Sequence, residues 1–118
     1  MTVTYRLTGG GSALIETLNP GTPGEMVSVY HRDHEAWVLT HYCAAGNQPR
    51  MRGTPAADSK AALDIAFSFT DATNVDPKVG RMDAMRLTLV DATHLRHEWT
   101  FAGPEGRQTH AFELTKRS

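Results

Sequence analysis

Short runs of alternating apolar and polar side chains recur along the chain, and each run ends at a cluster of turn residues. The clearest run, LDIAFSF, places Leu63, Ile65 and Phe67 on one side. This two-residue periodicity is typical of a β-strand with one buried face. No predicted helix is long enough to connect two parallel strands, and this excludes parallel α/β folds.

We therefore predict an all-β chain of about eight antiparallel strands joined by turns. An up-and-down barrel is the arrangement that most simply removes unpaired strand edges. We interpret residues 19–24 and 48–62 as loops, with one helical turn near 58–62, and we expect a short helix to begin at Asp76. The predicted strands cover residues 3–7, 12–18, 26–31, 36–43, 63–69, 83–91, 94–101 and 108–115.

The chain has 118 residues, which predicts one domain spanning residues 1–118. It carries 12 Lys and Arg against 13 Asp and Glu, without a basic or acidic run, which argues against nucleic acid or a charged membrane as partner. Its apolar runs are too short to cross a bilayer, and its N-terminal MTVTYRL does not resemble a signal peptide. A single cysteine cannot form an internal disulfide, so we expect a reducing, cytoplasmic location.

Three predicted strands carry histidines on the same face as large apolar side chains, and burial of those apolar groups makes this face the interior. Glu16 joins the interior if Leu14 and Leu18 point inward, whereas Ile15 belongs to the competing face. Buried imidazoles need hydrogen-bond partners. The three faces are Trp37, Leu39, His41 and Cys43; Leu95, His97, Trp99 and Phe101; and His110, Phe112 and Leu114.

An apolar interior that contains a few polar groups is typical of a ligand pocket. We interpret this interior as the binding site of a small, largely apolar molecule, whose polar end the histidines orient. This interpretation requires no cofactor. The candidate ligand-binding residues are Glu16, Tyr30, Trp37, Leu39, Trp99, Phe101 and Phe112.

Cys43 supports an alternative, a small esterase-type hydrolase. An imidazole from His41, His97 or His110 would lower the pKa of the thiol and accept its proton, and Glu16 would orient that imidazole. No nucleophile elbow or oxyanion motif accompanies the cysteine. The three histidines could also bind zinc, or one could bind haem iron, but no HxH or HExxH spacing supports a metal site.

Three strings carry a likeness that covers most of the chain: GGSALIETLNPGTPGEMVSVYH (residues 10–31), LTHYCAAGNQPRM (39–51) and MRLTLVDATHLRHEWTF (85–101). They resemble a bacterial family of small lipocalin-like, or calycin-like, β-barrels, whose members are mostly of unknown function. The resemblance implies a calycin-type barrel with an interior cavity. It brings no established reaction and no catalytic residues.

Chains of that family usually begin with a further strand, which contains a Gly-x-Trp element, ahead of the segment equivalent to residues 2–7. This chain starts after that strand, so we expect two unpaired edges. Val3, Tyr5 and Leu7 share one face of the first edge, and no proline blunts it. We therefore predict a homodimer with residues 2–7 or the neighbouring edge in the interface. A monomer would instead need the loop 49–62 to cover the gap.

Overall fold

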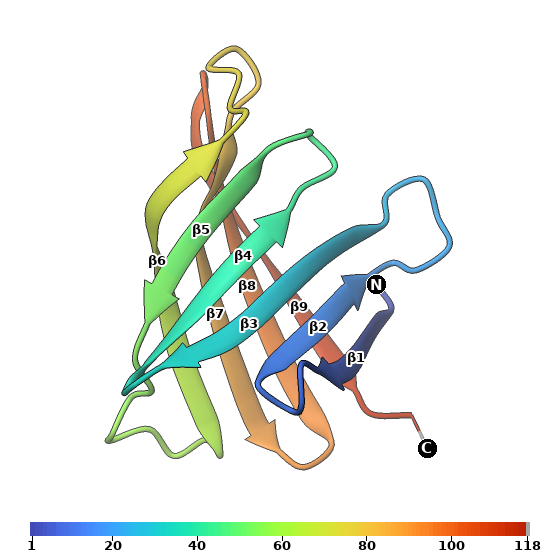
Figure 1. Ribbon diagram of the computed structural model, residues 1–118, viewed down its shortest axis with the longest axis vertical. Coiled ribbons are helices and arrows are strands. Elements are labelled where there is room, and N and C mark those ends of the chain that lie inside the picture. Colours follow the sequence, from blue (N-terminus) through green and yellow to red (C-terminus); the bar gives the residue numbers. More distant parts are fainter. Residues whose placement is uncertain (118) are drawn as a thin grey trace.

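The computed structural model describes residues 1–117, which form nine β-strands and no helix (Figure 1). Each strand pairs antiparallel with the next one in the sequence, so the sheet order runs from β1 to β9 without a crossover. No helix in this part of the chain has the length and apolarity that a membrane span requires. The strands are β1 (Val3–Thr8), β2 (Ala13–Leu18), β3 (Met26–Asp33), β4 (Ala36–Tyr42), β5 (Gln48–Gly53), β6 (Leu63–Thr73), β7 (Arg81–Asp91), β8 (His94–Gly103) and β9 (Gly106–Thr115).

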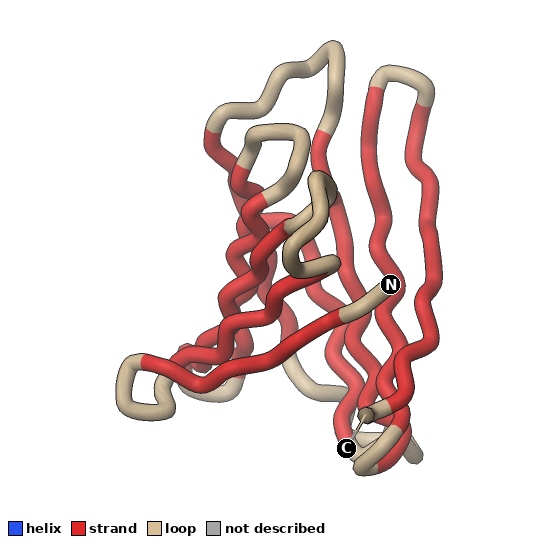
Figure 2. The backbone as a smooth tube through the Cα atoms, turned by 90° about the vertical axis from the view of Figure 1, so that its right-hand side faces the viewer, coloured by secondary structure: helices blue, strands red, loops and turns tan. Residues whose placement is uncertain are grey.

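The sheet curls into a lipocalin-like half-barrel, with β1 and β9 at its two edges (Figure 2). Neither edge strand pairs with a further strand among residues 1–117. Because an up-and-down meander reverses direction at every strand, the first and ninth strands run in the same direction. Direct closure would therefore require a parallel pair, whereas every other pair in the sheet is antiparallel.

The concave face of the half-barrel holds the hydrophobic core. Leu39 on β4 lies opposite Met51 on β5, and Met85 on β7 lies opposite both Phe67 and Trp99. Each of these five side chains is at most 3% exposed. Burial stabilises the fold by about 25 cal/mol per Å² of apolar surface, so this face provides most of the driving force for folding.

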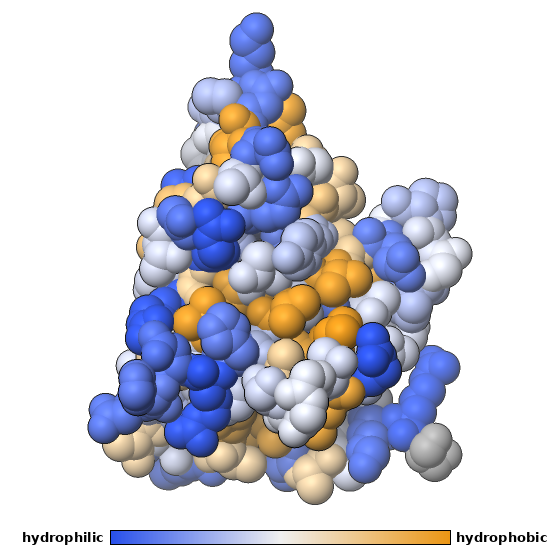
Figure 3. Space-filling model, viewed as in Figure 1, coloured by the Kyte–Doolittle hydropathy of each residue, from blue (hydrophilic) through white to orange (hydrophobic). Residues whose placement is uncertain are grey.

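The convex face carries the alternate residues of the same strands. Val29 and Val38 alternate with the buried Tyr30 and Leu39, and they remain partly exposed. Figure 3 shows hydrophobic residues interspersed with hydrophilic ones on the face where β3 and β4 lie. The alternation predicted from the sequence thus separates a buried face from a solvated one.

Strand β5 corrects the prediction of a loop over residues 48–62. Pro49 is the reason that the sequence argues against a strand there, because proline lacks a backbone donor. Pairing with β4 runs only from Arg50 to Gly53, so Pro49 is not part of that ladder and pairs only with Ala72 on β6. The proline is therefore tolerated near the beginning of an internal strand.

The two predicted short helices are also wrong. Residues 58–62 form turns and bends, and the segment before β6 is held beside that strand by a hydrogen bond of 2.8 Å from the Ala56 N–H to the Asp64 carbonyl. It lies next to the middle of the sheet and does not cover the gap between β1 and β9. Asp76 caps a turn instead of a helix, because its carboxylate accepts the Lys78 N–H at 2.9 Å.

Gly80 joins β6 to β7 at a point where the chain approaches β8 closely. Its φ of +102° disfavours other residues, and a Cβ there would lie 2.3 Å from the Ala102 carbonyl oxygen. We expect Gly80→Ala to lower the free energy of unfolding by about 2–4 kcal/mol, measured by urea denaturation. Gly106→Ala is the matched control, because its φ is +113° but no atom lies within 4 Å of the added Cβ. Equal losses in the two variants would contradict a role for the close approach.

Candidate functional site

Four polar side chains, one from each of the first four strands, form a row across the sheet. Tyr5 on β1 lies opposite Glu16 on β2, Glu16 lies opposite Ser28 on β3, and Ser28 lies opposite His41 on β4. Directly paired residues of adjacent strands point to the same face of a sheet, which here is the concave face. Glu16, Ser28 and His41 are each 0% exposed. The register of three successive hairpins thus places a polar row within the apolar core.

The carboxylate of Glu16 is the acceptor at the centre of this row. Its Oε2 accepts the Tyr5 hydroxyl at 2.6 Å, and its Oε1 accepts the Tyr30 hydroxyl at 3.0 Å. Burial raises the pKa of Glu16 above its ordinary value, and the hydrogen bonds from Tyr5, Tyr30 and Ser28 oppose that rise. Burial and the neighbouring carboxylate also raise the pKa of both tyrosines, so their hydroxyls stay protonated and act as donors.

His97 on β8 joins the row from the opposite wall of the half-barrel. Its Nε2 lies 2.9 Å from the Tyr5 hydroxyl and 3.3 Å from Oε2 of Glu16. The indole N–H of Trp99 donates to Nδ1 of His97 at 3.4 Å. Because an indole N–H can only donate, Nδ1 carries no proton and Nε2–H is the donor to Tyr5. This neutral imidazole agrees with a pKa that burial lowers to about 4.

His41 is engaged through only one of its two ring nitrogens. Its Nδ1 lies 2.9 Å from the Ser28 hydroxyl, whereas the buried Nε2 has no hydrogen-bond partner among residues 1–117. The imidazole packs against the Trp99 ring with the centroids 4.7 Å apart. Burial lowers the pKa of His41 to about 4, so the ring is neutral near pH 7.

A cavity of about 130 Å³ lies beside His41. His41 and the exposed His110 are the titratable side chains among the described residues that line it. None of these lining residues exposes a polar atom to the cavity, so its wall is an apolar surface, and the unpartnered Nε2 of His41 is itself buried. The lining residues are Met1, Leu18, Met26, His41, Met82, Trp99, Phe101, His110 and Phe112.

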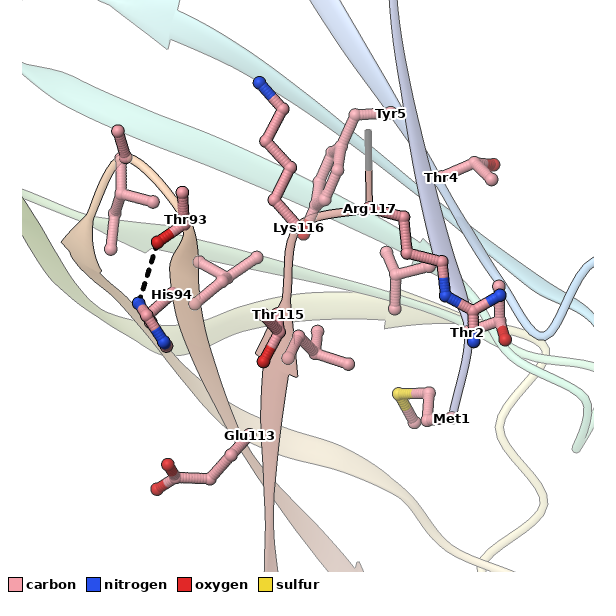
Figure 4. Close-up of a pocket in the computed structure, with 15 residues that line it drawn as sticks. Met1, Thr2, Thr4, Tyr5, Thr93, His94, Glu113, Thr115, Lys116 and Arg117 are labelled. Carbon is pink, nitrogen blue, oxygen red and sulfur yellow. Dashed lines mark hydrogen bonds between the residues drawn. The ribbon is translucent and has the colours of Figure 1, made fainter.

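A second, larger cavity of about 810 Å³ occupies the open side between the two edges of the sheet. Figure 4 shows Thr2, Thr4 and Tyr5 on the β1 side, and Glu113 and Thr115 on the β9 side. Tyr5 lines this cavity and is 41% exposed, yet its hydroxyl reaches the buried Glu16. Tyr5 thus connects the open side of the half-barrel with the polar row.

The structure brings most of the predicted ligand-binding residues together on the concave face. Glu16, Tyr30, Leu39 and Trp99 are buried there, and Glu16 follows the face of Leu18 rather than the competing one. Phe101 and Phe112 line the smaller cavity. Trp37 packs against the edge of the core, and the centre of its ring lies 5.6 Å from the guanidinium carbon of Arg32. Trp37 is not among the residues that line the smaller cavity.

Cys43 lies apart from this arrangement, in the turn after β4. Its backbone N–H donates to the Asn47 carbonyl and its carbonyl accepts the Gly46 N–H, both at 3.0 Å. The partly exposed thiol makes no hydrogen bond to a histidine within residues 1–117. His41 and His97 bond instead to Ser28, Tyr5 and Trp99. A role of Cys43 as nucleophile stays a prediction.

Sequence reasoning missed Tyr5 and Ser28 as members of the site. Both have ordinary strand positions, so neither composition nor a motif distinguishes them. The signal that could have found them is the register of the hairpins, because the turn Gly9–Gly11 pairs Thr8 with Ala13 and therefore Tyr5 with Glu16. The register in turn depends on turn geometry, which the triple glycine does not specify.

Comparison of the chain with protein-family models, curated proteins and solved structures finds no match. Within residues 1–117, no three or more His, Cys, Asp or Glu side chains gather in a way that could hold a metal ion. The geometry of the concave face is therefore the basis for any functional conclusion.

Proposed function

We propose that the protein binds a small, largely apolar molecule on the concave face of the half-barrel, in the cavity beside His41. The observation that supports this proposal is an apolar cavity of about 130 Å³, whose wall is formed mainly by aromatic rings and methionine side chains. A dry cavity of about 150 Å³ is enough to hold benzene. The cavity beside His41 is slightly smaller than this, so it suits a ligand whose body is no larger than about one aromatic ring, flanked by Trp99 and Phe112.

Binding of one-ring aromatic compounds tests this function. We expect toluene or phenol in excess to raise the thermal unfolding temperature, since a ligand that binds only the native state stabilises it by mass action. Phe112→Trp should weaken this effect at least tenfold in ligand concentration, because the larger ring fills the cavity. Tyr42→Trp, at an exposed position on the convex face, is the matched control. A cavity-filling variant that responds like the control would contradict the proposed site.

We also propose that two copies associate through the open sides of their half-barrels. The unpaired edges β1 and β9 face a cavity of about 810 Å³, in which Val3, Leu95 and Leu114 form an apolar part of the wall. Unpaired strand edges next to apolar surface favour pairing with another chain. A second copy of this chain offers the same edges, and a two-fold arrangement would cover both at once.

Sedimentation equilibrium at micromolar concentration tests this association. We expect a species with twice the 13.0 kDa mass of one chain. Leu114→Lys should shift it to the monomer, because the ammonium would be buried in the interface. Val90→Lys, at a position 51% exposed, should leave the dimer intact. A wild-type protein that sediments as a monomer would refute the proposal.

A further inference from the structure

The last strand of the sheet presents a long and regular unpaired edge. β9 pairs with β8 without a register shift along its 10 residues, and its other side has no partner strand among residues 1–117. Its residues are exposed except Phe112 and Leu114, which are partly buried, and no proline interrupts it. An edge of this kind is a template for a further strand. The opposite edge, β1, has only 6 residues and a single charge at Arg6.

Two opposite charges lie on β9 at equal distances from His110, three residues before it and three after it. Arg107 donates to the Asp83 carboxylate at 2.7 Å, and Glu113 accepts a hydrogen bond from Arg96. The side chains of Arg107 and Glu113 are still 61% and 78% exposed, so each can contact a further ion. A copy of β9 that ran antiparallel and crossed at His110 would therefore meet each of these charges with the opposite one.

We propose that β9 pairs antiparallel with β9 of a second copy about a two-fold axis at His110. This inference rests on the proposed association of two copies, and it names the strand and the register that join them. A two-fold axis perpendicular to a sheet places an edge strand antiparallel to its own copy, with the residue on the axis opposite itself. Pairing of β9 with β1 of the copy, about an axis along the strands, would give a parallel pair, because β1 and β9 run in the same direction.

This register joins two existing ion pairs into one row of alternating charges across the junction, and the two-fold axis repeats the row. Opposite charges that face each other across two strands stabilise the pairing, whereas like charges destabilise it. An axis one residue further along, at Ala111, would set both charges opposite threonines and lose these contacts. The row consists of Arg96 and Glu113 of one copy, followed by Arg107 and Asp83 of the other.

The junction would also border the smaller cavity. His110 and Phe112 line that cavity. In the proposed register, Phe112 lies opposite Gln108 of the second copy, and the two His110 side chains face each other. The second copy thus contributes side chains next to the cavity that we propose as the ligand site.

Charge reversal tests the register. Arg107→Glu alone sets two glutamates against each other, and Glu113→Arg alone sets two arginines against each other. We expect each variant by itself to weaken the dimer about tenfold in Kd, measured by sedimentation equilibrium. In an equimolar mixture of the two variants every contact again joins a glutamate to an arginine, so dimers should return, which also shows that both variants are folded. Lys78→Glu, in the exposed turn before β7, is the matched control and should leave the Kd unchanged.

Cross-linking locates the axis in a background that carries Cys43→Ser. His110→Cys places a thiol directly opposite its own copy, so mild oxidation should give a covalent dimer. Thr109→Cys lies opposite Ala111 of the copy, so it should cross-link far faster in a mixture with Ala111→Cys than by itself. A wild-type protein that stays monomeric refutes the association itself. A wild-type dimer that resists the charge reversals and does not cross-link through His110→Cys keeps the association but overturns the pairing of β9 with its copy.

Discussion

Replacing Glu16 by alanine is expected to destabilise the protein by about 3–5 kcal/mol, the largest effect that we expect from one substitution. The carboxylate accepts the hydroxyls of Tyr5 and Tyr30 at its two oxygens, and it lies 3.3 Å from Nε2 of His97. Its removal leaves buried donors without their acceptor and opens a void in the core. A domain of this size has a total stability of only about 5–15 kcal/mol, so a large part of it would be lost.

Urea denaturation followed by tryptophan fluorescence measures this loss. Glu16→Gln should cost less than alanine, because the amide keeps one oxygen for one of the two tyrosines. Glu35→Ala is the matched control, since this glutamate is exposed in the turn between β3 and β4, where a substitution changes stability by less than about 0.5 kcal/mol. A loss below about 1 kcal/mol for Glu16→Ala would mean that the tyrosines and His97 form other hydrogen bonds without the carboxylate.

The second large effect is a loss of stability in mild acid. Burial lowers the pKa of both His41 and His97 from about 6.5 to about 4. In the window between these values the unfolded chain binds protons that the native protein does not bind, so the free energy of unfolding falls as the pH falls. Each histidine contributes up to about 3 kcal/mol, and its contribution levels off below pH 4. Glu16 acts in the opposite direction, because its raised pKa makes the native state take up a proton first as the pH falls.

Unfolding in urea at several pH values between 7 and 4 measures this dependence. His41→Leu should remove about half of the acid-induced loss, because one of the two buried imidazoles is gone. His31→Leu, on the exposed face of β3, is the matched control. A stability that stays constant from pH 7 to pH 4.5 in the wild type would contradict the lowered pKa of the two histidines, or would show that Glu16 compensates them fully.

The sequence predicted every strand except β5, and the inner faces of β4, β6 and β8, because both depend on local alternation. Leu39, His41, His97 and Trp99 lie inward, as the large apolar members of their strands require. The face of Glu16 could not be predicted, since the apolar residues on the two sides of β2 are equally strong. Its buried position depends on partners from three different strands, which are tyrosine hydroxyls from β1 and β3 and the His97 imidazole from β8. Local patterns carry no information about such contacts.

The hydrogen-bond partners of the histidines could not be predicted for the same reason. Their positions on inner faces followed from the sequence, but their partners did not. Cys43 falls on the inner side of the extrapolated alternation, yet β4 ends at Tyr42 and the chain turns there. The strand end thus separates the thiol from His41, although they are only two residues apart. Strand ends are set by turn geometry and tertiary pairing, which a period of two does not describe.

The contact between Tyr5 and His97 joins residues that lie 92 positions apart in the sequence. The strand pairing of the sheet, in contrast, links only strands that follow one another along the chain. Hairpins between neighbours form early in folding, and contacts of high sequence separation form late because their loops are costly to close. The hydrogen bond between Tyr5 and His97 connects the β1–β2 hairpin to β8 on the opposite wall of the half-barrel. If this bond forms late in folding, the hairpin should open before the rest of the sheet unfolds, and its backbone amides should then exchange their hydrogens. Met1, which precedes β1, lines the smaller cavity. Slower hydrogen exchange in β1 would then report that the interior of the protein is occupied.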